Sequence, residues 1–281
     1  MFRSRLISSI CLIALLAGMV WQEYRSGLFL MVSILALVAQ WEFYIMQEAK
    51  GLKVFKKAGL MAGAVFLLTI YLTLLFPPAE PRHTQGVETF AILCGILFIL
   101  SRQVFEKAQN TAVLTVALTL FGFIYVPYLF ISFQNLFEQA TQEGDGIMLA
   151  LYLVVVTKVT DIGAYLWGSW LGRHKMIPQI SPKKTWEGFA GGILTSIGAS
   201  VGLSLLLPEQ LAPITGIHAV ILGLVLSLVS VVGDLAESVI KRDSQSKDSG
   251  AVIPGIGGSL DLVDSLLYTG PLFYSYLILV A

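Results

Sequence analysis

Long apolar segments alternate with short polar ones along almost the whole chain. A helix needs about 20 apolar residues to cross the hydrocarbon core of a bilayer. Nine segments of roughly this kind are predicted as membrane spans: Leu6 to Trp21, Gly27 to Met46, Ala58 to Phe76, Val87 to Leu100, Thr111 to Phe133, Ile147 to Leu171, Phe189 to Leu207, His218 to Glu237, and Leu262 to Val280. The first and fourth are short, and the first has a cleaved signal peptide as its alternative, although no clear small-residue cleavage site follows it. The pattern predicts an all-α, polytopic integral membrane protein.

The basic residues indicate how these helices cross the membrane, because Lys and Arg accumulate in short cytoplasmic loops. With a cytoplasmic N-terminus, the loops on the outer side hold only Arg25 and Arg82, and Lys158 lies within a span. All other Lys and Arg residues then fall on the cytoplasmic side. The sequence therefore predicts a cytoplasmic N-terminus and an external C-terminus.

The composition agrees with a membrane protein and excludes several other classes. Hydrophobic residues make up 56% of the chain and charged residues only 13%, whereas a soluble domain has about 25% charged residues. The 18 basic residues balance the 18 acidic ones, so there is no net basic charge for a nucleic-acid partner. The two cysteines lie in apolar runs without the spacing of a zinc site.

The two halves of the chain differ in character. Ionisable residues within or next to the predicted spans concentrate in the second half. We expect an N-terminal transmembrane scaffold of about five helices over residues 1–135 and a C-terminal catalytic transmembrane domain of about four helices over residues 146–281. In the scaffold, Glu42 is interpreted as a carboxylate that reaches the membrane interface from the end of its helix.

Two polar segments of the second half are candidate binding sites. Lys158 and Asp161 lie three residues apart on one face of a predicted span, where charge is expensive and usually functional. The alternative is a structural ion pair between helices. Further along, Ser181 followed by proline predicts a helix start, which places Lys183 and Lys184 in a first turn that favours anions. This arrangement predicts a phosphate site, with ordinary cytoplasmic positive charge as the alternative.

The densest group of ionisable residues runs from 233 to 265. Four of its members follow helical spacing and share one face: Asp234, Glu237, Ser238 and Lys241. Five more follow them: Arg242, Lys247, Asp248, Asp261 and Asp264. Carboxylates without histidine or cysteine favour Mg²⁺ over zinc, and the basic residues between them indicate a phosphate-bearing substrate. The alternative is an interfacial loop with mutually satisfied charges and a helix-capping aspartate.

The order of residues in this region resembles the signature of the phosphatidate cytidylyltransferase family, also called the CDP-diacylglycerol synthases. The matching residues are Ser238, Lys241, Arg242, Lys247, Asp248, Pro254, Gly255, Gly257, Gly258, Asp261 and Asp264. Residues 161–165 and 181–188 are similar to further family motifs. The chain departs from the signature at Ile256, Ser259 and Leu262, where the family usually has His, an aliphatic residue and Arg.

The resemblance implies an enzyme that converts CTP and phosphatidic acid to CDP-diacylglycerol and pyrophosphate, with Mg²⁺ and a monovalent cation such as K⁺. It also implies a homodimer in the inner (plasma) membrane, with the active site facing the cytoplasm. The predicted metal ligands are Asp234, Asp261 and Asp264, with Asp248 as ligand or close neighbour. The residues predicted to neutralise the triphosphate are Lys241, Arg242 and Lys247. The predicted substrate-binding residues are Lys158, Asp161, Ser181, Lys183, Lys184 and Ser238.

Two other functions remain open from the sequence. One is a CTP-dependent kinase or cytidylyltransferase that acts on a different lipid, because its metal site would look the same. The other is an ion-coupled transporter that uses Lys158, Asp161, Asp234 and Asp261 as its embedded charges. A transporter predicts such charges in both halves, whereas here they cluster in one half.

Overall fold

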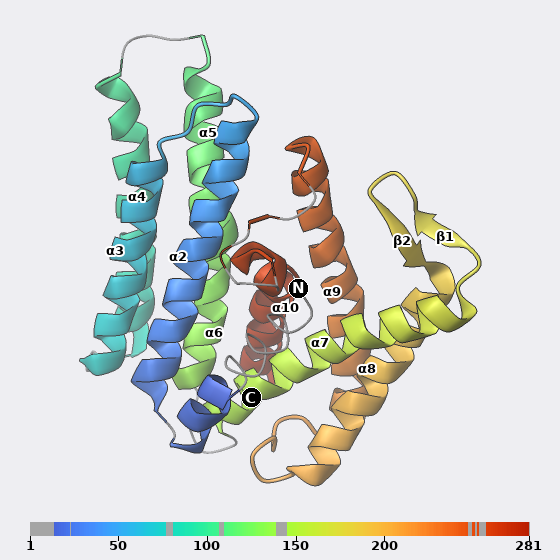
Figure 1. Cartoon of the computed structure of the whole chain (residues 1–281). Coiled ribbons are helices and arrows are strands. Elements are labelled where there is room, and N and C mark those ends of the chain that lie inside the picture. The colour runs from blue at the N-terminus through green and yellow to red at the C-terminus, as the bar shows by residue number, and fades with distance from the viewer. Residues whose placement is uncertain are drawn as a thin grey trace. The chain divides into compact units, whose positions relative to one another are not determined.

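The structure is a computed structural model. It describes residues 14–22, 24–76, 81–106, 110–138, 145–246, 249–250, 252 and 257–280. Within these ranges the chain is almost entirely helical, with one short hairpin between two of the helices (Figure 1).

The elements follow one another from the first scaffold helix to the C-terminal helix. The helices are α2 (Arg25–Ala49), α3 (Lys56–Leu75), α4 (Pro81–Val104), α5 (Ala112–Phe123), the π-helix η1 (Ile124–Tyr128), α6 (Leu129–Glu138), α7 (Gly146–Leu171), α8 (Trp186–Leu206), α9 (Ile217–Asp243) and α10 (Ser259–Val280). The strands are β1 (Lys175–Ile177) and β2 (Ser181–Thr185), between α7 and α8.

The predicted all-α membrane architecture is confirmed. Eight helical segments in the described part of the chain are long and apolar enough to cross a bilayer, and they correspond to the second to ninth predicted spans. One of them, Ala112–Phe137, runs through α5, η1 and α6, and its π-helical turn contains Pro127, which has no backbone N–H to donate. Residues 6–13 of the first predicted span lie outside the described residues, and residues 14–21 are helical. The orientation in the membrane stays a prediction.

The chain forms two compact units. Unit 1 contains Met1–Ile131 and Ser244–Leu262, and unit 2 contains Ser132–Asp243 and Val263–Ala281. The sequence predicted one boundary between residues 135 and 146. In the structure the segment 244–262 returns to the N-terminal helices, so part of the signature region belongs to unit 1.

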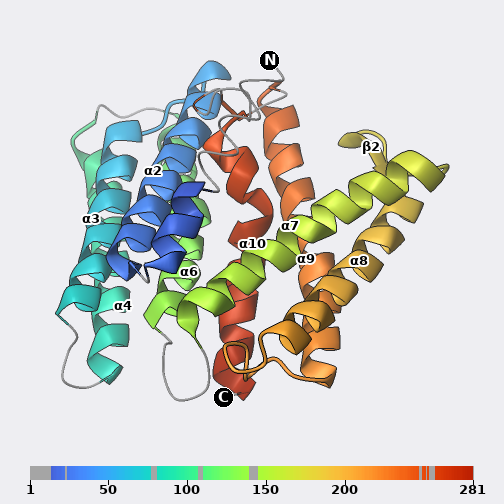
Figure 2. The same cartoon turned by 60° about the horizontal axis from the view of Figure 1, so that its bottom comes forward.

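In unit 1, helices α2 to α5 lie side by side (Figure 1), and Figure 2 shows α2, α3 and α4 from another direction. A buried polar chain ties them together. Gln40 Nε2 donates to Tyr44 Oη and to Gly59 O, each at 3.0 Å, and Tyr44 Oη donates to Thr119 O at 2.7 Å. Because buried polar groups are costly when unpaired, these bonds stabilise one arrangement of the scaffold helices.

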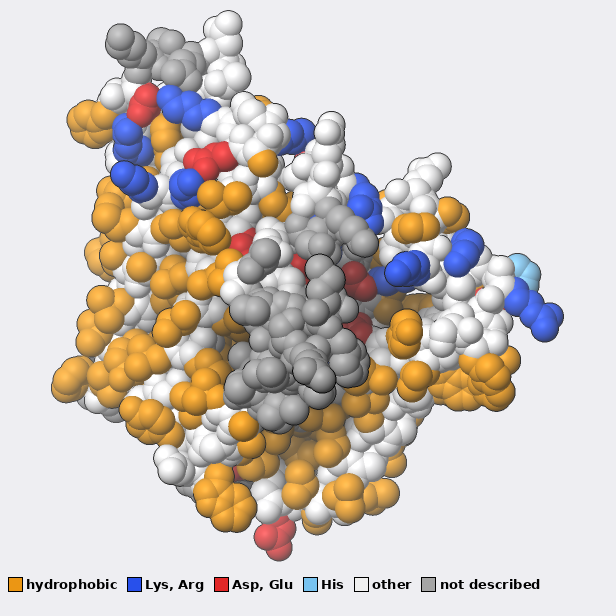
Figure 3. Space-filling model, in the orientation of Figure 1, with side chains coloured by type: hydrophobic (Ala, Val, Ile, Leu, Met, Phe, Trp, Pro, Cys, Tyr) orange, Lys and Arg blue, Asp and Glu red, His pale blue; other side chains and the backbone are white. Residues whose placement is uncertain are grey.

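The surface of unit 1 separates apolar and charged side chains. Hydrophobic side chains cover much of its visible face, while basic residues gather at one end (Figure 3). At that end Lys53 and Arg102 bind Glu106 at 3.0 and 2.6 Å. The hydrogen bond from Lys53 holds the pKa of Glu106 below its ordinary value. An apolar belt with charges at its end is the pattern expected of helices in lipid.

In unit 2, α7 packs along α8 and α9, and glycines allow the close approach. A Cβ at Gly188 would lie 2.6 Å from Ala164 O, and a Cβ at Gly223 would lie 2.7 Å from Ile197 Cα. Small residues at such positions let transmembrane helices approach backbone to backbone. They bring the polar faces of α7, α8 and α9 together.

The predicted helix start at Ser181 is wrong. Residues Ser181–Thr185 form strand β2, which pairs antiparallel with β1 so that Lys175 lies opposite Thr185. Helix α8 begins at Trp186, and its N-cap is Thr185, whose Oγ1 accepts a hydrogen bond from Gly188 N at 3.1 Å. Proline at the second position fits a short strand as well as a helix start, and pairing with the neighbouring strand β1 decides between them.

Candidate active site

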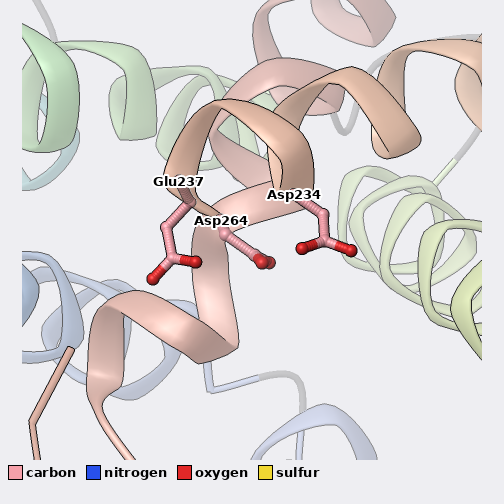
Figure 4. A group of neighbouring side chains, drawn as sticks. All are labelled: Asp234, Glu237 and Asp264. Carbon is pink, nitrogen blue, oxygen red and sulfur yellow. The ribbon is translucent and has the colours of Figure 1, made fainter. Parts of the chain in front are cut away.

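Three carboxylates of unit 2 form a compact acidic group. Asp234 and Glu237 come from α9 and Asp264 comes from α10, and each offers an oxygen within 4.8 Å of the others (Figure 4). The spacing of three residues places the first two on one face of α9. Gly233 allows α10 to approach, because a Cβ there would lie 3.0 Å from Asp264 O.

Two lysines face the α9 carboxylates. Lys184, the last lysine of β2, binds Asp234 through Nζ and Oδ2 at 2.7 Å. Lys241 pairs with Glu237 one turn away on the same helix, and Glu237 is fully buried. Burying a carboxylate in an apolar interior is costly unless a positive group lies beside it. These pairs therefore reduce the free-energy cost of burying the two carboxylates.

The third carboxylate lies near the polar face of α7. Asp264 is 7% exposed, and its Oδ1 accepts a hydrogen bond from Ser265 N at 2.6 Å. Lys158 Nζ lies 3.9 Å from Asp264 and 3.7 Å from Asp161. Asp161 also accepts a hydrogen bond from Ser230 Oγ on α9 at 3.4 Å. The predicted pair of α7 is thus part of the same polar centre as the acidic group.

A cavity of about 420 Å³ opens beside Asp234. Its charged lining consists of Asp161, Lys175, Lys183, Lys184 and Asp234. Its remaining walls include the glycine backbone of α7 and α8 and the side chains of Tyr165 and Phe189. A cavity lined by both lysines and apolar side chains can receive a phosphate that is attached to an apolar group.

The hairpin that carries the cavity lysines is fixed to the start of α8. Glu187, in the first turn of α8, accepts hydrogen bonds from the backbone N–H groups of Arg173 and His174 at 3.1 and 3.2 Å. His174 Nδ1 also bonds to Glu187 Oε1. Glu187 thereby anchors the entry to β1. His174 is a surface residue, as its neighbours in the sequence indicate.

Asp261, one of the predicted metal ligands, has a different set of partners. Its Oδ2 accepts hydrogen bonds from Ser249 N at 3.1 Å, Ser249 Oγ at 2.9 Å and Gly258 N at 3.0 Å. Asp261 and its partners Ser249 and Gly258 all belong to unit 1. The acidic group found among the described residues contains Glu237 and not Asp261. A metal role for Asp261 stays a prediction.

Glu42 does not reach the membrane interface, so its interpretation from sequence is wrong. It is 1% exposed, and its Oε2 accepts hydrogen bonds from Leu260 N at 2.9 Å and Ser249 Oγ at 3.4 Å. The sequence did not indicate the burial of Glu42, because its partners Ser249 and Leu260 lie more than 200 positions further along the chain. The departure at Ser259 also has a contact, since Ser259 Oγ donates to Leu35 O at 3.0 Å.

The other predicted site residues are placed as follows. Ser238 Oγ donates to Asp234 Oδ1 at 3.4 Å, so it lies against the acidic group. Arg242 Nε donates to Ile180 O at 3.3 Å, which places the guanidinium at the hairpin. Ser181 begins β2, and Lys183 lies exposed on the cavity wall. Lys247, Asp248 and Ile256 lie outside the described residues.

Glu237, the member of the acidic group that was missed, could have been identified from its spacing to Asp234. The two residues are three apart on a predicted helix, and the sequence already placed both on one polar face. Glu237 was not among the predicted metal ligands. Its burial, which marks it as part of the group, depends on packing.

Comparison with known proteins decides the family. The model of the cytidylyltransferase family matches residues 3–280, nearly the whole chain. The chain belongs to this family. The cytidylyltransferase is 35% identical over 224 residues to the phosphatidate cytidylyltransferase of Bacillus subtilis (strain 168), covering 78% of this chain and 79% of that protein. It is 34% identical over 261 residues to the protein of the same name from Staphylococcus aureus (strain COL), covering 90% and 92%.

A further relative of this cytidylyltransferase is the uncharacterized protein YnbB of Escherichia coli (strain K12). The two are 36% identical over 189 residues, which covers 67% of this chain and 62% of YnbB. The resemblance found from the signature residues is therefore confirmed at the level of the family. The site residues and their roles remain predictions.

Proposed function

We propose that this cytidylyltransferase transfers the cytidylyl group of CTP to phosphatidic acid, giving CDP-diacylglycerol and pyrophosphate. The Bacillus and Staphylococcus relatives are both named phosphatidate cytidylyltransferase, which supports phosphatidic acid as the substrate. The observation that carries the proposal is the acidic group of Asp234, Glu237 and Asp264 beside a cavity that holds Lys183 and Lys184. Oxygen ligands next to phosphate-binding cations are the combination that nucleotidyl transfer needs.

The acidic group fits a magnesium ion. All three donors are carboxylate oxygens, and neither histidine nor cysteine belongs to the group. Mg²⁺ prefers oxygen ligands and commonly binds one or two carboxylates together with substrate phosphates. When bound, such an ion supplies Lewis acidity to the phosphate oxygens. Asp234, Glu237 and Asp264 would hold it, and a monovalent cation such as K⁺ beside it stays a prediction.

The lysines around the group would bind and neutralise the phosphates. Lys183 and Lys184 line the cavity, and Lys158 on α7 lies near Asp161 and Asp264. An oxygen of the lipid phosphate attacks the α-phosphorus of CTP, the bond from that phosphorus to the bridging oxygen breaks, and pyrophosphate leaves. The attacking oxygen is already ionised at neutral pH, so this chain needs no strong general base. Cations fixed in place would stabilise the charge that develops on the leaving group.

Aromatic side chains near the cavity support a position at the membrane surface. Tyr165 is 74% exposed, Trp170 is 76% exposed and Trp186 is 52% exposed, and all three belong to the ends of α7 and α8 beside the hairpin. Exposed Trp and Tyr are enriched at the level of the lipid headgroups. We infer that the cavity lies at headgroup depth, on the cytoplasmic side of the inner membrane. This position lets the lipid phosphate and CTP meet.

The test uses purified protein, phosphatidic acid, MgCl₂ and CTP labelled with ³²P at either the α- or the γ-phosphate. The α-label is expected to enter the lipid phase, and the γ-label is expected to remain in the water phase as pyrophosphate. Lipid that acquires the γ-label alone would show a CTP-dependent kinase. Label that stays in water with every divalent ion and every lipid phosphate tested would overturn the enzyme proposal and favour transport.

A matched pair of variants tests the site. Asp264→Asn removes one charge of the acidic group and is expected to lower kcat about 100-fold, the loss typical of removing a major electrostatic stabiliser. Asp145→Asn is the control, because Asp145 caps α7 through Ile147 N and asparagine caps as well. Equal activity of the two variants would contradict the assignment of Asp264. The predicted homodimer is checked separately by the mass of the detergent-solubilised enzyme.

A further inference from the structure

We propose that Glu42 of α2 is a positioning residue for the reaction. It holds the first turn of α10 in place and so sets the position of the carboxylate that α10 carries one turn later. The inference rests on the proposed role of Asp264. Glu42 lies in unit 1 and contacts Ser249 and Leu260, which also belong to unit 1.

The bond from Leu260 N to Glu42 is a helix cap supplied by another helix. Leu260 is the second residue of α10, and the first N–H groups of a helix have no partner within that helix. A carboxylate at this end also interacts favourably with the positive end of the helix dipole. Glu42 therefore does for α10 what an N-cap residue does locally.

A second bond ties the same turn to the same helix. Ser259 Oγ donates to Leu35 O, two turns before Glu42 on α2. Two attachments along α2 hold both the position and the rotation of the first turn of α10. This gives a physical reason for serine at a position where the family signature usually has an aliphatic residue.

The segment around Glu42 leaves no room for another arrangement. A Cβ at Gly258 would lie 1.9 Å from Ser249 Oγ and 2.8 Å from Glu42 Oε2. A Cβ at Gly250 would lie 2.3 Å from Glu42 Oε1. A side chain at either place would displace the Glu42 carboxylate, so the two glycines let the backbone lie directly against it. Asp261 closes the same segment from the other side through its bonds to Ser249 and Gly258.

The continuity of α10 links the contacts of Glu42 to Asp264. Helix α10 runs without interruption from Ser259 to Val280, and Asp264 follows Leu260 by four residues, about one turn. A slip or rotation of the first turn would therefore displace Asp264. Misplacing a catalytic group by about 1 Å costs on the order of 100-fold in rate. Glu42 bonds to the first turn of α10, so we expect it to act through this helix.

The experiment compares Glu42→Ala with Gln40→Ala. Gln40 lies two residues earlier on α2 and is as deeply buried, but it bonds to Tyr44 and Gly59 within the scaffold. Both variants lose buried hydrogen bonds, and their thermal unfolding in detergent is measured first. Per folded molecule, Glu42→Ala is expected to lower kcat at least 10-fold with KM for CTP within about twofold, while Gln40→Ala keeps kcat. Glu42→Gln keeps an acceptor for Leu260 N and is expected to recover most of the rate.

Hydrogen exchange provides a readout that does not depend on activity. The peptide covering residues 249–262 is expected to exchange faster in Glu42→Ala and at the wild-type rate in Gln40→Ala. Ser259→Ala is a milder variant that keeps Glu42. Ser259→Ala is expected to raise exchange in the same peptide and to lower kcat about threefold. If Glu42→Ala does not fold, Ser259→Ala replaces it as the test variant.

Unchanged exchange in this peptide, or equal losses of kcat in Glu42→Ala and Gln40→Ala, would overturn the proposal. A wild-type enzyme without lipid-phase label would overturn the proposed function instead. In that case the exchange comparison still decides whether Glu42 holds α10.

Discussion

Replacing Gly188 by alanine tests the geometry of the cavity most directly. Gly188 is the third residue of α8 and lies on the cavity wall. Its Cβ would lie 2.6 Å from Ala164 O and 3.0 Å from Gly168 Cα, and both atoms belong to the backbone of α7. No side-chain rotation can relieve a contact with backbone. The two helices must therefore move apart.

The size of the effect follows from these distances. To restore an ordinary contact, α7 and α8 must separate by about 0.4 to 0.8 Å at this point. Such overpacking costs about 1 to 3 kcal/mol, and the helical preference of alanine over glycine returns about 0.5 to 1 kcal/mol. A displacement of about half an ångström at the cavity wall should lower kcat/KM on the order of 10-fold.

The assays are thermal unfolding in detergent and lipid-phase label from α-³²P CTP, with Gly202→Ala as the matched control. Gly202 lies on the same helix, and its added Cβ would meet no atom within 4 Å. This control is expected to keep full activity and to gain up to about 1 kcal/mol in unfolding free energy. If Gly188→Ala behaved like the control in both assays, the close approach of α7 and α8 would not shape the cavity.

Three further predictions concern the hairpin and the charged end of unit 1. Lys184→Met removes a cation of the cavity and should lower kcat/KM for CTP about 100-fold. Because Asp234 loses its partner, the unfolding temperature should fall as well, and a loss of kcat/KM below threefold would contradict the role of Lys184 at the phosphates. Thr185→Ala removes the cap of α8 and should cost about 1 kcal/mol in unfolding free energy, whereas Thr185→Ser should cost much less. The hydrogen bond from Lys53 lowers the pKa of Glu106, so ionised Glu106 stabilises the folded protein above the ordinary pKa of 4.5. This stabilisation is lost as the pH falls through the lowered pKa of Glu106. The stability difference between wild type and Glu106→Gln should therefore shrink as the pH falls below 4.5, and a difference that grows would refute this.

Helical spacing predicted local relationships reliably. Asp234 and Glu237 were placed on one face of a helix, and the structure confirms this on α9. Lys158 and Asp161 were placed together, and they form an ion pair on α7. Such relationships depend on a period of 3.6 residues per turn within one element, so they are present in the sequence itself.

Relationships between separate segments were not predictable in the same way. The Ser-Pro pair indicated a helix start, but pairing of β2 with β1 makes it a strand and moves the N-cap to Thr185. Asp261 was predicted as a metal ligand together with Asp264, and its bonds from Ser249 and Gly258 were not foreseen. In both cases the contact is made with another segment, so a period within one element does not indicate it.

The sequence by itself determined that this chain crosses a membrane in many helices and belongs to the cytidylyltransferase family. Hydrophobic length and motif order carry that information, because lipid requires each spanning helix to satisfy its own backbone. Only the tertiary structure decided which carboxylates meet. Gly233 brings α10 against α9, and Glu42 holds the start of α10 from more than 200 residues away. Helix packing sets these contacts, and no local pattern in the sequence encodes them.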